Sequence, residues 1–219
     1  MALSKRLKAI ARYIEHDAIV YDVGCDHALL SCFLIKNGIA RKVYAGDNKK
    51  GPLAKAIENI KKEGLEDRVI PILADGLSKA PEDVDTVIIA GVGYHTAIKI
   101  LEETDIKRYK RIIVQINKET FRFRTYLSEH NYTIIDEDVV YDDFYYEIIV
   151  FSADRHEEYD LIERRYGPIL LRKQSPVFID HLLYKKKKLQ DILLRHKDMD
   201  LEEEIEEIDA IIFECDRDR

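Results

Sequence analysis

The hydrophobic positions of the chain change their spacing several times, and each spacing predicts a kind of element. Apolar residues recur every three or four positions from Leu3 to Ile14, with Ser4 as N-cap, which predicts an amphipathic helix. Short β-branched runs follow, separated by stretches of helical pattern, and predict strands at 18–23, 42–47, 69–73, 85–90 and 111–115. Strands that alternate with helices make right-handed crossovers, so we expect a mostly parallel sheet covered on both faces.

This alternation stops after the fifth predicted strand. Residues 132–140 and 144–151 are two strand-like runs separated by a short acidic turn, which predicts an antiparallel hairpin at the edge of the sheet. From Ser175 onward no run is strand-like. Two stretches with heptad spacing predict an antiparallel helical coiled-coil hairpin, through Phe178, Leu182, Lys185, Leu189, Ile192 and His196 in the first helix and Leu201, Ile205, Ile208, Ile212 and Cys215 in the second.

Together these patterns predict an α/β fold of two parts. We expect a Rossmann-like domain at 1–155 and a joint with the C-terminal helical hairpin at 156–219. The chain of 219 residues is 46% hydrophobic and 35% charged, as expected of a folded protein. No apolar run approaches the roughly 20 residues that span a bilayer, and the amphipathic start differs from a signal peptide. We therefore expect a cytoplasmic protein with no membrane partner.

The net charge of −7 is unevenly distributed. Residues 198–219 contain eleven acidic and two basic residues, so the rest of the chain is mildly basic. Each basic cluster is either solvated surface or a contact for nucleic-acid phosphates, and the lysines of the first C-terminal helix have the further alternative of pairing with Glu202 to Glu207. The candidate RNA contacts are Arg6, Arg122, Arg124, Lys185, Lys186, Lys187 and Lys188.

The three cysteines, Cys25, Cys32 and Cys215, form no CxxC pair and have no histidine at metal-ligand spacing. We therefore expect reduced thiols and no metal site.

In a doubly wound sheet, ligands bind beyond the carboxyl ends of the strands, so the residues after each strand are the candidates for chemistry. The first such turn is DVGCDH, residues 22–27. A dinucleotide fingerprint GxGxxG would place its second glycine at Asp26, where a carboxylate repels a pyrophosphate. A cationic cofactor without phosphate suits this loop better, and S-adenosylmethionine is a sulfonium. The Asp22-x-Gly24 pattern resembles motif I of class I methyltransferases.

Acidic residues also end the second and third predicted strands. Asp47 is placed to accept hydrogen bonds from ribose hydroxyls, and Asp75 lies where the methyltransferase fold commonly sets a polar residue against the adenine amino group. One such acid alone is equally a helix cap or turn former, but three at consecutive strand ends favour a cofactor site. The predicted cofactor-binding residues are Asp22, Gly24, Cys25, Asp26, Asp47, Asn48, Asp75, Gly76 and Gly91.

The residues that follow the fourth and fifth predicted strands indicate where a methyl acceptor would bind. Gly91 and Gly93 leave the backbone bare, so that a flat group can approach, and Tyr94 follows them. Gln115 and Asn117 bring amides to the same edge. The alternatives are a tight turn without function and amides that cap a strand end.

These motifs resemble a known family, the bacterial tRNA adenine N1-methyltransferases of the TrmK type. The resemblance is carried by LSKRL at 3–7, DVGCDHALL at 22–30, AGDN with GPL at 45–53, LADGL at 73–77, EDVDTVIIAGVG at 82–93, YEIIV at 146–150, and GPILL with SPVFI at 167–179. It implies a Rossmann-like class I methyltransferase domain, S-adenosylmethionine as cofactor, and adenosine 22 of tRNA as substrate, with no obligate protein partner. Two positions depart from the family pattern: Tyr94 replaces a glycine and Ile116 a proline.

The resemblance also suggests roles for the residues near the acceptor. Adenine N1 carries a lone pair and attacks without losing a proton, so positioning is the main task of the enzyme. Positive charge then develops on the ring, and an acceptor that faces N6 stabilises the transition state. Asp26 or Asn117 is the candidate acceptor, His27 a proton relay, and Tyr94 a stacking platform. Alternatively, Asp26 and His27 only cap the helix and orient the methionine moiety.

Two other function classes are compatible with the predicted sheet. One is an NAD-dependent oxidoreductase, which the missing fingerprint glycines disfavour. The other is a non-catalytic tRNA-binding protein with a vestigial cofactor site.

Overall fold

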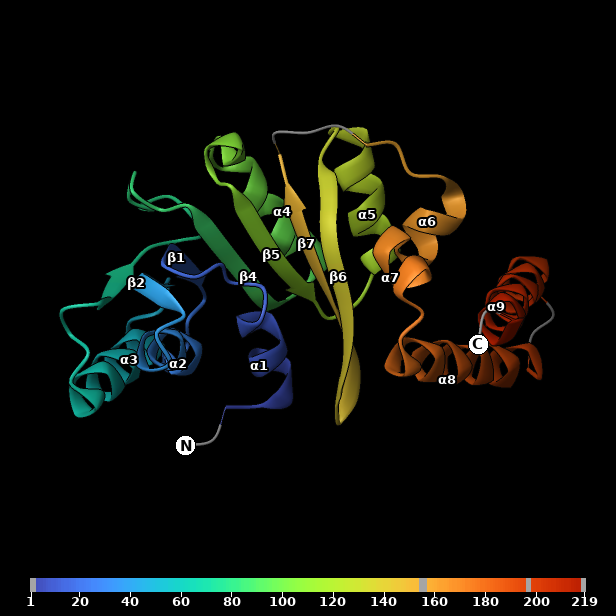
Figure 1. Ribbon diagram of the computed structural model, residues 1–219, viewed down its shortest axis with the longest axis horizontal. Coiled ribbons are helices and arrows are strands. Elements are labelled where there is room, and N and C mark those ends of the chain that lie inside the picture. Colours follow the sequence, from blue (N-terminus) through green and yellow to red (C-terminus); the bar gives the residue numbers. More distant parts are fainter. Residues whose placement is uncertain (1–2, 154–156, 196–197, 218–219) are drawn as a thin grey trace.

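A central sheet organises the computed structural model, which describes residues 3–153, 157–195 and 198–217. Within these residues the strands have the order β3-β2-β1-β4-β5-β7-β6 (Figure 1). Their bounds are β1 Ala18–Val23, β2 Ala40–Asp47, β3 Val69–Leu73, β4 Thr86–Val92, β5 Arg111–Ile116, β6 Thr133–Asp142 and β7 Phe144–Ser152. Strands β1 to β5 pair in parallel, while β7 is antiparallel to both β5 and β6. The predicted parallel sheet with an antiparallel edge hairpin is confirmed.

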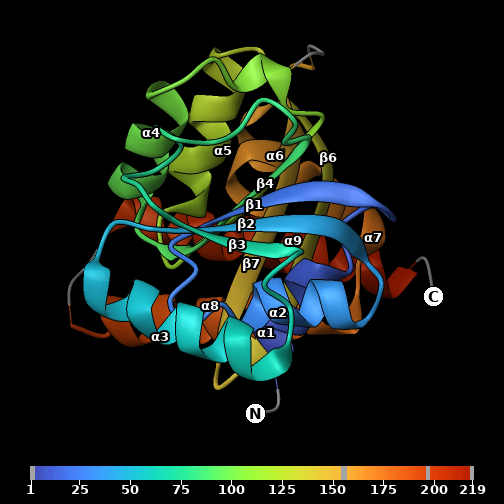
Figure 2. The ribbon, with the colours of Figure 1, turned by 90° about the vertical axis from the view of Figure 1, so that its left-hand side faces the viewer.

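Helices cover both faces of the sheet (Figure 2). On one face lie α1 (Lys5–Ala11), α2 (Leu29–Lys36) and α3 (Lys50–Glu63), and on the other α4 (Tyr94–Glu102) and α5 (Thr120–Glu129). A short 3-10 helix, η1 (Ile106–Arg108), precedes β5. Each face has its own buried cluster, with Ile10, Leu34 and Ile60 on the first and Ile100 and Phe123 on the second. All six residues of β1 are buried, as expected of a central parallel strand.

Local sequence signals explain where several helices begin and end. The Ser4 side chain accepts a hydrogen bond from the Leu7 amide and caps α1. Gly64 ends α3 in the left-handed conformation, with φ of 66°, which glycine adopts without steric cost. Two short helices, α6 (Leu161–Tyr166) and α7 (Pro168–Lys173), which the sequence pattern does not predict, lie before the C-terminal helical hairpin, in the stretch 152–174 that was predicted as the joint.

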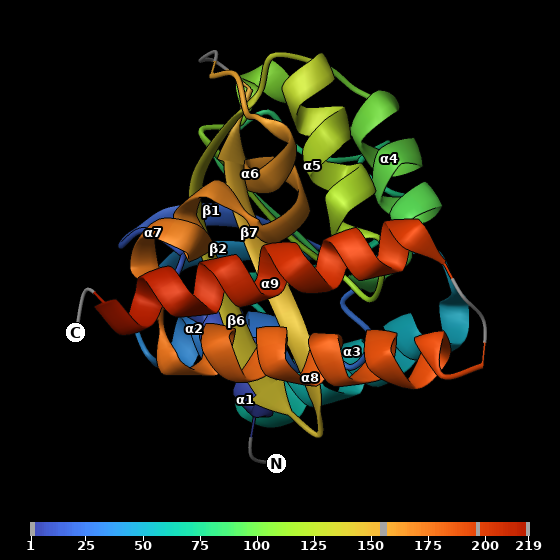
Figure 3. The same cartoon turned by 90° about the vertical axis from the view of Figure 1, so that its right-hand side faces the viewer.

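The C-terminal part is the predicted antiparallel pair of helices, α8 (Pro176–Leu193) and α9 (Met199–Arg217), which lie side by side (Figure 3). Their heptad residues Phe178, Leu182 and Leu189 form one buried cluster with Ile208 of α9. This cluster also includes Val139 of β6, so the hairpin packs against the edge of the sheet. The predicted heptad position His196 lies outside the described residues. The division at 155/156 stays a prediction.

Among the described residues, no helix combines the length and the apolar character needed to cross a membrane.

Candidate active site

The loop after β1 bends sharply at the carboxyl edge of the sheet. Gly24 has φ of +69° and Asp26 has φ of +50°, both in the left-handed region. Nothing lies within 4 Å of a Cβ added at Gly24, so there is open space beside this residue. Asp22, just before the bend, is buried, and its carboxylate accepts a 2.6 Å hydrogen bond from the Ser31 hydroxyl of α2. Burial raises the pKa of Asp22 to about 6, against the effect of that hydrogen bond.

Two cavities meet at Gly24. The β1-loop cavity, of about 110 Å³, lies between the loop and α1, and its lining includes Arg6, Asp22, Cys25, Asp26 and His27. The β3-end cavity, of about 290 Å³, is bounded by the ends of β2 and β3 and by α4, and its lining includes Asn48, Asp75, Gly76 and Lys99. Gly24 lines both cavities, so the two lie next to each other at the bend after β1.

Asp75 is the charged centre of the β3-end cavity. Its carboxylate accepts hydrogen bonds from Lys99 Nζ and from Asn48 Nδ2, each at 3.1 Å. The hydrogen bond from Lys99 holds the pKa of Asp75 below its usual value. Asp47 lies beside this cavity but is not part of its lining: it is 8% exposed, and its Oδ1 accepts a 2.8 Å hydrogen bond from the Lys49 amide.

Amide groups join the ends of β4 and β5 on the side predicted for the methyl acceptor. The Gly91 amide donates to Gln115 Oε1 at 3.1 Å, and Asn117 Nδ2 donates to the Gly91 carbonyl at 3.2 Å. Gln115 Nε2 in turn donates to Asn117 Oδ1 at 3.3 Å. Asn117 is exposed, so its carbonyl oxygen keeps a second lone pair for a ligand.

Arg6, which the sequence predicts as an RNA contact, also makes contacts within the chain, and its contact with RNA stays a prediction. Its guanidinium donates to Gln115 Oε1 at 2.5 Å and lies over the Tyr146 ring, 5.3 Å from its centre. A Cβ added at Gly91 would lie 3.1 Å from this guanidinium. Sequence reasoning missed this contact because it joins residues 109 positions apart. Arg6 therefore belongs to the acceptor edge of the site.

The remaining candidates for catalysis lie at the rim. Asp26 Oδ1 and His27 Nε2 are 3.4 Å apart, and the two side chains are 73% and 43% exposed. Tyr94 is the first residue of α4 and lines neither cavity. The Arg122 guanidinium lies 4.5 Å from the centre of the Tyr94 ring and also pairs with Glu119. One face of Tyr94 is therefore covered by a cation.

The prediction that Arg124 contacts RNA is wrong. Its side chain is 0% exposed. Nε donates to Glu137 and NH2 to Glu147, both at 2.6 Å, so the guanidinium is a structural cation between α5 and the β6–β7 hairpin. The sequence pattern gave no warning, because an arginine in an amphipathic helix is usually exposed.

The four lysines of α8 divide into two pairs. Lys185 pairs with Glu204 at 2.6 Å, within the predicted range Glu202 to Glu207, whereas Lys186 pairs with Asp209 at 2.5 Å, beyond that range. Lys187 and Lys188 are exposed, and within the described residues neither forms an ion pair.

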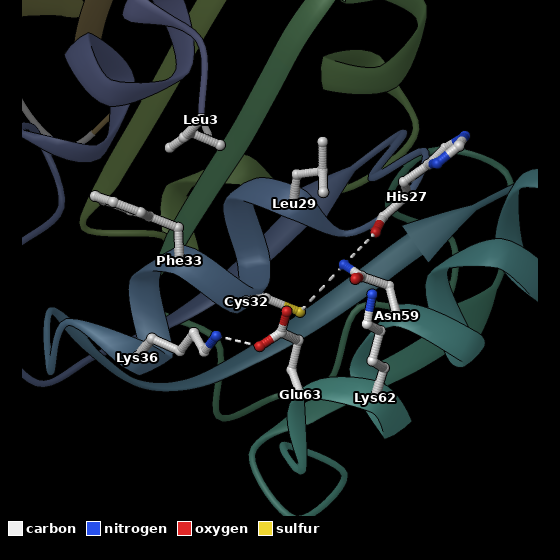
Figure 4. Close-up of a pocket in the computed structure, with 9 residues that line it drawn as sticks. All are labelled: Leu3, His27, Leu29, Cys32, Phe33, Lys36, Asn59, Lys62 and Glu63. Atoms are coloured by element: carbon white, nitrogen blue, oxygen red, sulfur yellow. Dashed lines mark hydrogen bonds and ion pairs between the residues drawn. The ribbon is translucent and has the colours of Figure 1, made fainter. Parts of the chain in front are cut away.

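A further cavity of about 270 Å³ lies between α2 and α3 and shares His27 with the β1-loop cavity. Figure 4 shows the Asn59 amide directed at the His27 carbonyl, 3.1 Å away, and at Cys32 Sγ, 3.9 Å away. At the opposite end, Lys36 and Glu63 form an ion pair. Asn59 thus ties α3 to the loop after β1, a role that the sequence pattern did not indicate.

In the part of the chain that the structure describes, no group of three or more His, Cys, Asp or Glu side chains is arranged to hold a metal ion.

Comparison with known proteins identifies relatives over nearly the whole chain. The family described as a methyltransferase domain matches residues 3–149. The tRNA (adenine(22)-N(1))-methyltransferase of Bacillus subtilis is 33% identical over 188 residues, which cover 82% of this chain and 79% of that protein.

Solved structures agree. A Streptococcus pneumoniae protein in complex with S-adenosyl-L-methionine is 31% identical, with a TM-score of 0.89 over 96% of this chain and 99% of that one. TrmK of M. capricolum, in complex with S-adenosyl-homocysteine, is 28% identical, with a TM-score of 0.82 over 99% of both chains. The similarity therefore includes the C-terminal helices as well as the sheet.

Proposed function

This chain belongs to the family of the tRNA (adenine(22)-N(1))-methyltransferases, and from that premise we propose that it transfers a methyl group from S-adenosylmethionine to N1 of adenosine 22 in tRNA. The observation that carries the proposal is the pair of cavities that meet at Gly24, at the carboxyl ends of β1 to β3. In a doubly wound sheet this is the edge where ligands bind.

The residues present fit S-adenosylmethionine. The β1-loop cavity presents Asp22 and Asp26 to a cationic centre, and the β3-end cavity offers Asp75 to an adenine amino group. Asp47, next to the latter, has one carboxylate oxygen without a partner among the described residues, which suits a ribose hydroxyl. A pyrophosphate would meet the Asp26 carboxylate, which disfavours NAD.

The chain's own residues then position the acceptor. Arg6, Gln115 and Gly91 hold the ends of β4 and β5 together, and Arg6 fills the space beside Gly91. Nothing lies within 4 Å of a Cβ added at Gly93, so a flat base can approach the backbone there. S-adenosylmethionine supplies the electrophilic methyl group. Asp26, with an exposed carboxylate, and Asn117, with a spare lone pair, are the acceptors available to the adenine N6 amino group.

The remaining predicted roles are part of the same proposal. Gly24, Cys25, Asn48 and Gly76 line the two cavities and border the cofactor, and Gly91 lies between Ala90 and Val92, which also line them. His27, 3.4 Å from Asp26, receives through Asp26 a proton that the N6 amino group of the cationic product releases after the transfer, and passes it to solvent. Tyr94 stacks on the target base with the face that Arg122 leaves open. Residues 1–155 carry the chemistry, and the helical part in 156–219 helps to bind tRNA through Lys187 and Lys188.

Mass spectrometry of nucleosides tests the proposal. Unmodified tRNA is incubated with the protein and S-adenosylmethionine labelled in its methyl group, then digested. We expect labelled 1-methyladenosine, and none from a control tRNA in which guanosine replaces adenosine 22. Label in another isomer or position would contradict the assignment. Absence of transfer by a protein that binds both ligands would favour a non-catalytic tRNA-binding protein, and a thermal shift with NAD alone would favour an oxidoreductase.

A further inference from the structure

A fourth cavity, of about 360 Å³, opens where the end of β5 meets α8. Its volume is within the range of about 300 to 1,000 Å³ that is typical of small-molecule sites. None of its lining residues lines the two cofactor cavities. Asn117, whose amide hydrogen-bonds the Gly91 carbonyl, forms part of its wall. The cavity therefore lies directly beside the acceptor edge of the proposed active site.

Aromatic rings form one wall of this cavity. The Tyr145 and His181 rings are stacked, with centres 5.0 Å apart and an angle of 16° between their planes. Tyr184 of α8 lies 5.3 Å from Tyr145 and is 41% exposed. Burial lowers the pKa of His181, which favours its neutral ring. The wall is thus largely uncharged, and its accessible outer ring, Tyr184, is tilted 43° from Tyr145 and is suited to stacking a nucleobase.

Cations stand at the rim of the same cavity. Lys188 Nζ lies 4.4 Å from the centre of the Tyr184 ring, and neither Lys188 nor Lys118 forms an ion pair within the described residues. Arg165 and Lys185 also line the cavity, but Arg165 forms an ion pair with Glu207 and Lys185 forms one with Glu204. Two uncompensated positive charges therefore remain beside the aromatic wall, which fits a phosphate.

The inner end of the cavity carries an acceptor. Glu147 accepts a 2.6 Å hydrogen bond from Arg124 on one oxygen and a 3.1 Å hydrogen bond from Thr120 on the other. The second oxygen keeps a lone pair that can accept from a base amino group, while a phosphate at this end would be repelled. These groups favour one orientation of a nucleotide, with its base at Glu147 and its phosphate at the rim.

We propose that this cavity is a second nucleotide-binding site, which takes the tRNA nucleotide next to the target adenosine. The base stacks on the face of Tyr184 that Lys188 leaves open, and its phosphate contacts Lys188 and Lys118. The inference rests on the proposed function, because the wall shared through Asn117 identifies the occupant as a neighbour of the methylated residue. Holding this neighbour away from the stack helps to expose the target base.

Substitutions in the cavity provide the first test. Fluorescence anisotropy with unmodified tRNA is measured at several salt concentrations. We expect Tyr184→Ala to weaken tRNA binding roughly 5- to 100-fold with an unchanged salt slope, and Tyr184→Phe to restore it. Lys188→Ala should reduce the salt slope by about one. Lys55→Ala, which removes an exposed lysine of α3 outside every cavity described, is the control and should match the wild type.

Abasic tRNAs provide the second and sharper test. Two synthetic tRNAs lack the base on the 5′ or on the 3′ side of adenosine 22. With wild-type protein, one of them should bind about as weakly as intact tRNA binds Tyr184→Ala. The same abasic tRNA should lose little more when combined with that variant, because both changes remove one contact. If Tyr184→Ala weakens the binding of each abasic tRNA by the same factor as it weakens the binding of intact tRNA, the inference is overturned.

The two tests separate this inference from the proposed function. Wild-type protein that forms no 1-methyladenosine on intact tRNA contradicts the proposed function itself. Wild-type protein that forms it, while Tyr184→Ala and Lys188→Ala bind and methylate tRNA like the Lys55→Ala control, contradicts the second nucleotide site and the tRNA contact proposed for Lys188, but not the proposed methyl transfer. Calorimetry with S-adenosylmethionine should show wild-type cofactor affinity in both cavity variants. A cofactor affinity that falls with Tyr184→Ala would overturn the separate identity of this cavity.

Discussion

The guanidinium of Arg6, at the start of the chain, donates a 2.5 Å hydrogen bond to Oε1 of Gln115, at the end of β5. The same oxygen accepts a hydrogen bond from the Gly91 amide, so α1 helps to fix the loop on which the target base is proposed to lie. A base positioned less accurately reacts more slowly even when bound, because catalysis here depends on geometry.

We therefore predict that Arg6→Ala lowers the single-turnover rate about 10- to 100-fold, as expected for loss of a hydrogen bond from a charged group worth about 1.5 to 3 kcal/mol. Arg6→Lys should recover only part of the rate, since an ammonium lacks the planar fork. The slope of tRNA affinity against salt should not change. A slope reduced by about one, with a normal rate, would instead return Arg6 to the predicted role of phosphate contact.

The Arg124 side chain leads to a prediction about stability. Because its guanidinium and both partner carboxylates are largely or fully buried, removing the cation leaves Glu137 and Glu147 without a counter-charge. Arg124→Ala should lower the free energy of unfolding by about 3 to 5 kcal/mol, measured by urea denaturation. Arg122→Ala, two positions away and exposed, should change it by less than about 0.5 kcal/mol. Equal effects of the two substitutions would contradict the assigned structural role.

Much of the fold was predictable because its elements carry strong local patterns. The central strands β1, β4 and β5 are β-branched runs that are largely buried, and the hairpin of β6 and β7 has a short turn at Asp143, with φ of 62°. The helices α6 and α7 were missed because each has only six residues, too few for a periodic pattern to be recognised. Their positions depend on packing, since α6 contributes Tyr166 and α7 contributes Leu170 to the cluster beneath α8 and α9.

The placement of the acidic candidates was predictable where strand order decides it. Asp22 and Asp47 lie at the ends of β1 and β2 and Asp75 follows β3, at the same edge of the sheet because parallel strands end together. Their binding of a cofactor stays a prediction. The partners of these residues were not predictable. Lys99 reaches Asp75 from α4 and Arg6 reaches Gln115 from α1, contacts that depend on how helices pack on the sheet. The burial of Arg124 was invisible for the same reason.

Asp47 should contribute to cofactor affinity. One of its oxygens holds the Lys49 amide, and the other is proposed to accept from a ribose hydroxyl. Asp47→Ala should weaken S-adenosylmethionine binding by about 1.5 to 3 kcal/mol in calorimetry, the range for a charge-assisted hydrogen bond. Asp47→Asn keeps an acceptor for the Lys49 amide and should lose less. Unchanged affinity in Asp47→Ala, with an unchanged melting temperature, would contradict the ribose assignment.

Asp22 should make both folding and cofactor binding depend on pH. Its folded-state pKa of about 6 is above the value of about 3.9 of an unfolded aspartate, so folding favours the protonated form. The contribution of Asp22 to stability is therefore greatest below about pH 4 and is lost as the pH rises through about 6. A cationic cofactor favours the ionised form, so its affinity should rise over the same interval.

Calorimetry from about pH 5 to 8 and urea unfolding from about pH 4 to 7 measure these two dependences. In Asp22→Asn, the pH dependence of stability and of cofactor affinity that Asp22 causes should disappear. Above about pH 6, the cofactor affinity of this variant should be lower than that of the wild type. Ser31→Ala is the matched variant: it removes the hydrogen bond to the carboxylate and should move the cofactor transition to higher pH. Identical pH profiles in wild type and Asp22→Asn would contradict the prediction.

Substitutions at Asp26 distinguish its two possible roles. Its carboxylate either accepts a hydrogen bond from the adenine N6 amino group or only orients the cofactor. Its φ of 50° makes Asp26→Asn the informative substitution, because asparagine tolerates the left-handed conformation that alanine resists. Asparagine removes the charge but leaves the backbone in place.

An acceptor that faces N6 interacts more strongly as positive charge develops on the ring, so Asp26→Asn should lower the single-turnover rate about 100-fold with saturating cofactor. Asp26→Ala should lower both the rate and the cofactor affinity. If Asp26→Asn methylates tRNA at the wild-type rate once cofactor is saturating, the carboxylate acts only on the cofactor or the loop, and Asn117 becomes the remaining candidate acceptor.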